Sequence, residues 1–400
     1  MKPGEIESSP DCASAILGPD FAAESAGGFN LWPLFSISWA HFLNDGASNY
    51  LPAVLPAVLV TMHIPVALVG VVMAALLAGQ VLQPLCGLVA DRLGGRSLVL
   101  IGVAASTLGG ALIGIAPSYS ILICVLLAVG MGGAVFHPQA LAVVRQIGFG
   151  SRQGLFLSTF LVGGELGRGL WPMLASLIVV HFGLHALIVL ALPTLFTLPL
   201  VIKEMPSVHA RTNAAPRLSL NHHGRPLAIL VGYSGLRAAV TYSLTTFLPL
   251  MWAEKGGSLV GGASLITTLL TAGIFGNLAG GHLSDRFSRK SVVIATSILS
   301  AVLLVILLLV QGPILWVILG LLGMAMFATF PLQVLIAQDI LPDNRALGSG
   351  LALGFSNGIG AAAMMLFGPV AARWGIPFVL WSNVGLAIAA VAAATFLPPG

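Results

Sequence analysis

Long apolar runs separated by short polar segments fill almost the whole chain after its first thirty residues. Six runs precede a polar, Pro- and His-bearing segment at 203–225, and six follow it. The runs are 31–60, 66–90, 97–117, 119–144, 154–180 and 184–202, then 226–252, 259–284, 291–310, 313–338, 347–371 and 375–397. A helix needs about 20 residues to cross a bilayer, and the longer runs predict tilted helices. The pattern therefore predicts an all-α integral membrane protein with twelve transmembrane helices.

Composition supports this prediction and excludes an array of soluble domains. Only 8% of the 400 residues are charged and 57% are hydrophobic, whereas soluble domains carry about 25% charged residues. Residues 1–30 hold scattered charges without an apolar core, so we expect a cytoplasmic N-terminal tail and no signal peptide. The three cysteines, Cys12, Cys86 and Cys124, have no disulfide or metal-site spacing. The sequence has no nucleotide-binding loop, zinc spacing or nucleophile elbow, and we expect no enzymatic activity, cofactor, metal or nucleic acid partner.

The basic residues between the runs are distributed unevenly and predict the orientation. One set of segments holds thirteen lysines and arginines, and the opposite set holds Lys255 and Arg373. Basic residues accumulate on the cytoplasmic side of membrane proteins. We therefore expect both termini and the 203–225 linker in the cytoplasm.

A charged segment recurs at about half the chain length. The first copy is Gly87-Leu-Val-Ala-Asp91-Arg92-Leu-Gly-Gly95-Arg96, and the second contains Asp285-Arg286, with the two aspartates 194 positions apart. Tyr50-Leu-Pro52 and Phe247-Leu-Pro249 repeat in the same way, as do Gly164-Glu-Leu-Gly167 and Asn357-Gly-Ile-Gly360. Such parallel repeats predict two six-helix halves, 31–202 and 226–400, with the substrate path between them near the middle of the membrane.

The first run carries the densest group of polar residues. His41, Asn44, Asp45 and Ser48 follow one another at i, i+3, i+4 and i+7, so they share one face of a helix, and Asn49 lies beside them. Asp45 is 14 positions after Leu31, the start of the run. The plain alternative is that Asp45 caps or tethers a helix end, but a carboxylate at this depth favours a functional role.

Two further groups of charge lie inside runs. Glu165 and Arg168 are three positions apart and can pair on one helix, either as a packing pair or as one that exchanges partners with substrate. Arg237 lies near hydroxyl groups, including Tyr242, and arginine suits carboxylate or phosphonate groups.

Other polar residues within the runs are weaker candidates for lining the path. A lone histidine such as His137 is as often a satisfied core residue as a binding group, and amides can simply bond between helices. The set of candidate substrate-binding residues is His41, Asn44, Asn49, His137, Gln139, Glu165, Arg168, Arg237, Tyr242, Gln333 and Asn357.

The motifs resemble a known family. The first charged segment resembles the signature loop of the major facilitator superfamily. His41-Phe-Leu-Asn44-Asp45-Gly, Leu51-Pro52-Ala-Val-Leu-Pro56, Leu82-Gln83-Pro84, Ala134-Val-Phe-His137-Pro138 and Ala337-Gln338-Asp339-Ile-Leu-Pro342 resemble the fosmidomycin-resistance family of efflux carriers. The resemblance implies a drug/proton antiporter of the bacterial inner membrane in which Asp45 is the proton-linked carboxylate and His137 a cavity residue. It also implies a cytoplasmic gate, made here of Gly87, Asp91, Arg92, Gly95, Arg96, Asp285 and Arg286.

The chain departs from that family where Gln139 replaces an expected acid after His-Pro and where Glu165 and Arg168 replace neutral residues. We predict a monomeric, proton-coupled exporter of a small organic compound, a drug or metabolite that can be anionic. Asp45 is the better proton carrier, because its helix face offers histidine and asparagine but no fixed cation at i±3 or i±4, whereas Arg168 stabilises ionised Glu165. The alternatives are proton-coupled uptake of an organic anion and a membrane receptor that moves nothing.

Overall fold

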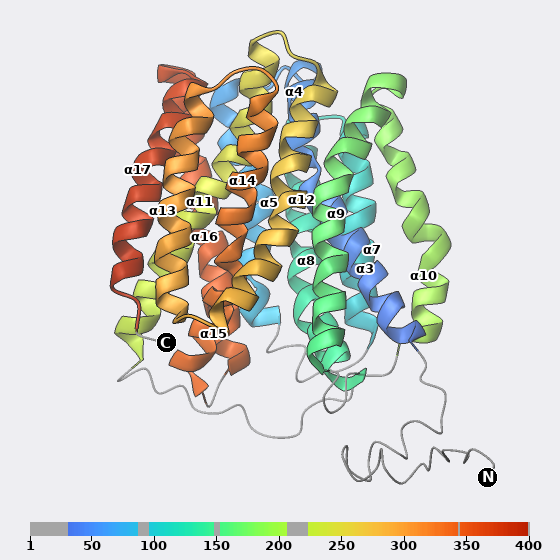
Figure 1. Cartoon of the computed structure of the whole chain (residues 1–400). Helices are drawn as coiled ribbons and strands as arrows, with labels where there is room; N and C mark the ends of the chain where they lie inside the picture. The colour runs from blue at the N-terminus through green and yellow to red at the C-terminus, as the bar shows by residue number, and fades with distance from the viewer. Residues whose placement is uncertain (1–30, 87–95, 148–152, 206–222, 343–344, 399–400) are drawn as a thin grey trace, which may run out of the picture.

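The computed structural model describes residues 31–86, 96–147, 153–205, 223–342 and 345–398. Within these ranges every long regular element is a helix, and the helices run side by side in two groups (Figure 1). The predicted all-α membrane fold with two six-helix halves is confirmed.

The helices follow the predicted apolar runs. The first half contains α3 (Trp32–Asn49), α4 (Leu51–Thr61), α5 (Val69–Val81), α7 (Arg96–Leu112), α8 (Tyr119–Ile147), α9 (Gln153–Phe182) and α10 (Leu192–Glu204). The second contains α11 (Gly224–Glu254), α12 (Leu259–Ser284), α13 (Arg289–Leu309), α14 (Ile314–Ala328), α15 (Phe330–Ile340), α16 (Arg345–Trp374) and α17 (Ile376–Thr395). Twelve crossings result, because α3 with α4 and α14 with α15 each make one.

Several of the predicted single helices are interrupted, which the apolar pattern did not indicate: the second crossing breaks at Leu82, and the sixth begins as a 3-10 segment, Leu184–Ala191, before α10. The first crossing breaks at Tyr50 and the tenth at Thr329, and in both cases a proline stands in the first turn of the following helix. Proline lacks the N–H that would continue the helical hydrogen bonds, so a helix readily restarts there. The repeat is not exact, since α11 continues through Pro249.

Ten stretches of the described chain are long and apolar enough to cross a membrane by composition. The first crossing, α3 with α4, and the fifth, α9, are not among them. These two carry His41, Asp45, Glu165 and Arg168, whereas His137 lies on α8 and Arg237 on α11, and α3 and α9 pack along each other. Both acids singled out from the sequence and Arg168 thus lie on two helices that pack together.

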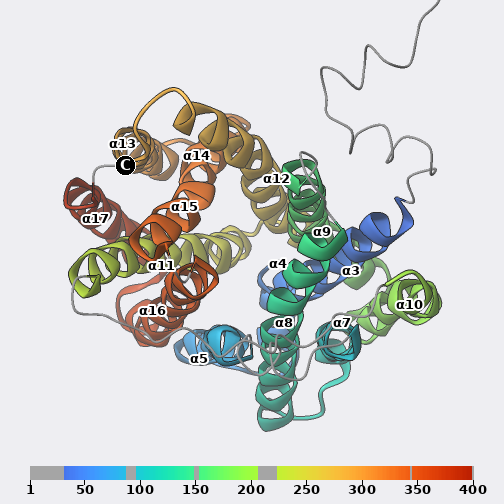
Figure 2. The ribbon, with the colours of Figure 1, turned by 90° about the horizontal axis from the view of Figure 1, so that it is seen from below.

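The halves meet along two pairs of helices. Viewed from below, α5 lies beside α16 and α9 beside α12, one helix of each pair coming from each half (Figure 2). The short helix α4 adds contacts to α11 and α12. By contrast, α8 packs against helices of the first half and α15 against helices of the second.

Most of the predicted cytoplasmic gate lies outside the described residues. Gly87, Asp91, Arg92 and Gly95 fall there, as does the 1–30 tail, and the description of Arg96 is limited to its backbone at the start of α7. Asp285 and Arg286 form an exposed turn after α12. Close to that turn, Arg289 of α13 pairs with Asp339 of α15.

Candidate functional site

Glycines allow α3 and α9 to approach each other closely. A Cβ atom on Gly163 would lie 2.4 Å from the carbonyl oxygen of Ser38, and one on Gly167 would lie 2.1 Å from that of Phe42. No side chain fits at such distances, so these positions bring backbone against backbone. This contact sets how far side chains of α9 reach toward α3.

The predicted polar face of α3 is buried within the protein. Relative exposures are 3% for His41, 0% for Asn44, 2% for Asp45 and 4% for Ser48. Ionisable side chains at these positions need partners, because an unpaired charge in a buried site is costly.

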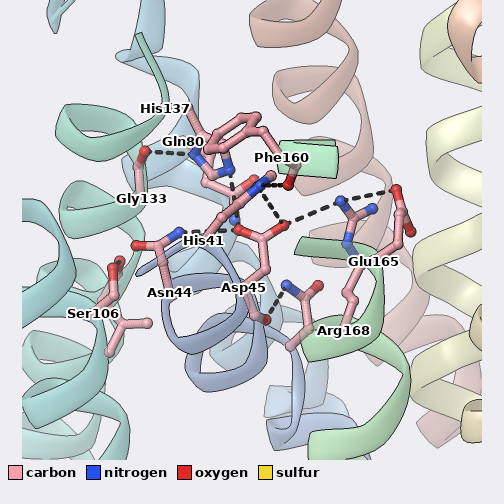
Figure 3. A network of polar contacts seen from close by, with 12 residues as sticks. His41, Asn44, Asp45, Gln80, Ser106, Gly133, His137, Phe160, Glu165 and Arg168 are labelled. Carbon is pink, nitrogen blue, oxygen red and sulfur yellow. Dashed lines mark hydrogen bonds and ion pairs between the residues drawn. The ribbon is translucent and has the colours of Figure 1, made fainter. Parts of the chain in front are cut away.

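The Asp45 carboxylate is the centre of this face, and four side chains reach it (Figure 3). Its Oδ1 accepts a hydrogen bond from Asn44 Nδ2 at 3.0 Å and lies 3.0 Å from His137 Nε2. Its Oδ2 accepts from Arg168 Nη2 at 3.1 Å and lies 3.4 Å from His41 Nε2. Three different helices therefore converge on one acid.

Arg168 contacts two buried acids of the first half, Asp45 and Glu165. Its Nη2 atom contacts Asp45 across the α3–α9 interface and also lies 3.3 Å from Glu165 Oε1 on its own helix. The sequence indicated only the pairing of Arg168 with Glu165. It showed no fixed cation on α3 one turn away from Asp45. The structure supplies one from α9, so the two acids share a single guanidinium group.

Backbone carbonyls fix the protonation of one nitrogen in each histidine. His137 Nδ1 lies 2.7 Å from the carbonyl oxygen of Gly133, and His41 Nδ1 lies 2.8 Å from that of Phe160. A carbonyl oxygen can only accept, so each Nδ1 must carry the hydrogen. In both rings it is Nε2 that faces Asp45.

The contact between His137 and Asp45 therefore requires a further proton. With Nδ1 protonated, a neutral His137 presents a lone pair at Nε2, and an ionised carboxylate presents another at Oδ1. Two acceptors at 3.0 Å repel, so a hydrogen must lie on either Nε2 or Oδ1. The side chains of His137 and Arg168 are 27% and 21% exposed, whereas that of Asp45 is 3% exposed.

His41, Asp45 and His137 are also residue types that bind metal ions. Ligand atoms of His41, Asp45 and His137 lie within 4.8 Å of one another, and Nε2 is the free nitrogen in both rings. Arg168, however, already binds the carboxylate, and its fixed positive charge opposes a divalent cation. The arrangement fits a proton better than a metal ion.

A second series of hydrogen bonds connects the two halves. Tyr242 of α11 donates to Asn357 Oδ1 of α16 at 2.7 Å, and Asn357 Nδ2 donates to Gln80 Oε1 of α5 at 3.2 Å. Tyr242 and Asn357 are among the residues predicted to bind substrate, and Gln80 is hydrogen-bonded to Asn357.

The remaining predicted residues do not contact the Asp45 carboxylate. Arg237 lies on α11 with its guanidinium 5.5 Å from the centre of the Phe330 ring. Gln139 and Gln333 are buried, and the Gln333 amide donates to Thr329. Asn49 donates to the backbone oxygen of Asp45.

Comparison with known proteins agrees with this architecture. A family model described as Major Facilitator Superfamily matches residues 37–358 and 230–400. The uncharacterized MFS-type transporter YfnC of Bacillus subtilis is 27% identical, over 85% of this chain and 87% of its own. The fosmidomycin resistance protein of Escherichia coli is 26% identical, over 86% and 88%.

A solved structure shares the fold. The bacterial homolog to the human lysosomal transporter Spinster, in an inward-facing and occupied conformation, superposes with a TM-score of 0.75 at 16% identity, over 93% of this chain and 97% of its own. The family match, the helical architecture and the transporter relatives agree that this chain belongs to the Major Facilitator Superfamily and is a multi-pass membrane transporter, not an enzyme.

Proposed function

We propose that this transporter is proton-coupled, exports a small organic compound by alternating access, and holds the coupled proton between Asp45 and His137. One observation carries the proposal. His137 Nδ1 is committed to a backbone carbonyl, so the 3.0 Å contact between Nε2 and Oδ1 needs a proton that either partner can hold.

The charges of the first half favour exchange of this proton for substrate. With both acids ionised, Arg168 charged and the proton present, the charges of Asp45, Glu165, Arg168 and the His137–Asp45 proton sum to zero. Without the proton the net charge of these groups is −1, and no hydrogen lies between Asp45 Oδ1 and His137 Nε2. A cationic or hydrogen-bond-donating group of the substrate would then take the proton's place. Competition for one position is what an antiporter requires.

Glu165 has a different role in this scheme. It keeps Arg168 in place on α9 when substrate or a proton competes for Asp45, since Arg168 Nη2 lies within 3.3 Å of both carboxylates. We propose that Asp45 exchanges the proton and that Glu165 adjusts how strongly Arg168 holds Asp45.

Proton-coupled uptake of an organic anion is the second candidate, and Arg237 favours it. Among the described residues no carboxylate lies within ion-pair distance of Arg237. When the positive charge of Arg237 is added, the net charge of these groups in the protonated state is +1. One bound anion would neutralise it. Proton and anion would then move together in the same direction.

The cellular setting follows the bacterial relatives and the basic-residue pattern. We propose that the chain acts as a monomer in the bacterial inner membrane, with both termini in the cytoplasm. The fosmidomycin resistance protein, among its relatives, makes antibiotic efflux the first activity to test.

Transport in membrane vesicles of both orientations tests these proposals. Export predicts that energised inverted vesicles accumulate a compound from a panel of antibiotics, including fosmidomycin, and organic acids, and that a protonophore abolishes the accumulation. Asp45→Asn and His137→Gln should lose accumulation, while Gly133→Ala, with an added Cβ no closer than 3.9 Å to any neighbour, serves as the matched control. Accumulation only in right-side-out vesicles would favour uptake, and absence of counterflow for every compound would leave the receptor alternative.

A further inference from the structure

Among the described residues, two buried atoms of oppositely charged side chains lack hydrogen-bonding partners, one in each half of the protein. Glu165 Oε1 contacts Arg168, but Glu165 Oε2 is buried and accepts no hydrogen bond. Arg237 Nε is buried and donates none, and the guanidinium lies over the face of the Phe330 ring, at 5.5 Å. Buried charges without full pairing are costly, so each of these atoms gains from a partner of opposite charge.

The two side chains lie at matching depths in the bundle. Helix α9 begins at Gln153 and α11 at Gly224, both at the lower end of the bundle in Figure 1. Glu165 follows the start of α9 by 12 positions, and Arg237 follows the start of α11 by 13. A rise of 1.5 Å per residue places both side chains about 18–20 Å from the starts of their helices.

Glu165 also lies on the side of α9 that meets the second half. Gly169, one turn further along the same face, packs on Thr271 of α12, where an added Cβ would lie 2.5 Å from the threonine methyl group. In the close view of Figure 3, the Glu165 carboxylate lies beyond Arg168, on the side away from Asp45. The oxygen of Glu165 without a partner therefore belongs to the boundary between the halves.

Arg237 is close enough to this boundary for the charges of Glu165 and Arg168 to act on it. In the present arrangement, however, Glu165 is paired with Arg168 and Arg237 lies on Phe330. Contacts of α4 with α11 and α12 join the halves at the upper end in Figure 1, opposite to the starts of α9 and α11. A rocking movement that brings the lower ends together would shorten the distance between Glu165 and Arg237.

We propose that Arg237 pairs with Glu165 when the halves close at the end where α9 and α11 begin, and that this ion pair stabilises the closed arrangement. Arg168 then keeps Asp45 as its carboxylate, so Glu165 changes its partner between the two arrangements. The inference rests on the alternating access of the proposed function and adds Arg237 to it as a positioning residue. It depends on neither the coupled proton nor the direction of transport.

Distances between spin labels on the two halves test the pair. With the native cysteines replaced, labels at Lys203 of α10 and at Phe287 after α12, both exposed at the lower end, report whether that end is closed. In lipid nanodiscs, double electron–electron resonance should show a short and a long distance. Arg237→Gln and Glu165→Gln should each lower the ratio of short to long distances by about 10-fold, the lower range for a hydrogen bond to a charged group. The double variant should lower it no further, because the same interaction is lost in all three.

Three comparisons separate the pair from folding and from proton coupling. Arg373→Gln is the matched control, because Arg373 makes a similar contact with an aromatic ring, that of Trp374 at 5.7 Å, and should leave the ratio unchanged. Arg237→Lys keeps the positive charge and should restore most of the short distance. In an Asp45→Asn background, Arg237→Gln should still lower the ratio.

The proposal is overturned if every variant shows one and the same distance or if Arg237→Gln leaves the ratio unchanged. It is also overturned if Arg237→Gln acts as strongly in the Glu165→Gln background as in the original protein, or if Arg237→Lys loses as much as Arg237→Gln. Ratios that change as expected in a protein without proton-driven transport would support the pair and contradict the proposed coupling.

Discussion

Replacing Gly167 by alanine should separate α3 from α9 and uncouple Asp45 from Arg168. The new Cβ would lie 2.1 Å from the Phe42 carbonyl oxygen and 3.0 Å from the Gly46 nitrogen. Both are backbone atoms of α3 and cannot rotate away. An ordinary carbon–oxygen contact is more than 3 Å, so the helices must move apart by about 1 Å or distort.

The same movement acts on the neighbouring Arg168. Its 3.1 Å contact with Asp45 would lengthen to about 4 Å, which at an effective dielectric of about 20 weakens the attraction by roughly 1 kcal/mol. Overpacking of the helix contact adds about 1–3 kcal/mol of destabilisation. We expect Gly167→Ala to unfold at a lower temperature and to lose most proton-driven transport.

Thermal unfolding in detergent and transport in vesicles, measured side by side, check this expectation. Gly133→Ala is the control, because its Cβ would lie beside the same network at 3.9 Å from Asn44 and His137. Alanine also has the higher helix propensity, so the control should be as stable as the original protein or slightly more stable. The reasoning is refuted if Gly167→Ala is as stable and active as the unchanged chain, or if both variants are impaired equally.

Three other predictions concern orientation, the gate and Glu165. A cysteine placed in the 203–225 linker should resist an impermeant thiol reagent in intact cells, and labelling there would reverse the assigned orientation. Asp91→Asn should leave thermal stability unchanged yet slow transport, and an unaltered turnover would exclude a role for Asp91 in gating. Glu165→Gln leaves Arg168 with Asp45 alone, so it should change the apparent affinity for substrate while proton-driven transport continues; loss of proton flux in this variant with retention in Asp45→Asn would reverse the two roles.

The sequence predicts the helices and the polar face of α3 because both follow from periodicity along one element. The apolar runs locate the twelve crossings, and the i, i+3, i+4, i+7 spacing identifies the face that contains Asp45. The pairing of Glu165 with Arg168 follows from the same kind of local spacing.

The partners of Asp45 on other helices could not be predicted in this way. The contact with Arg168 depends on how closely α3 and α9 approach, which Gly163 and Gly167 set through backbone contacts between residues far apart in the chain. The orientation of the His137 ring depends on a bond to the Gly133 carbonyl, and periodicity carries no information on which ring nitrogen is bound. The helix break at Tyr50 could not be predicted from the local sequence either. The matching Leu-Pro pair in α11, which ends at Pro249, leaves that helix continuous.

The protonation of His137 tests the central claim most directly. Nitrogen-15 magnetic resonance of histidine-labelled protein in lipid, assigned with His137→Gln, reports which ring nitrogen carries hydrogen between about pH 5 and 9. We predict that Nδ1 stays protonated throughout, and that at low pH Nε2 is either protonated or hydrogen-bonded to a protonated Asp45, with this second signal lost at high pH and altered in Asp45→Asn. A neutral ring protonated at Nε2 with a bare Nδ1, or a titration that Asp45→Asn leaves unchanged, would contradict a proton shared between Asp45 and His137.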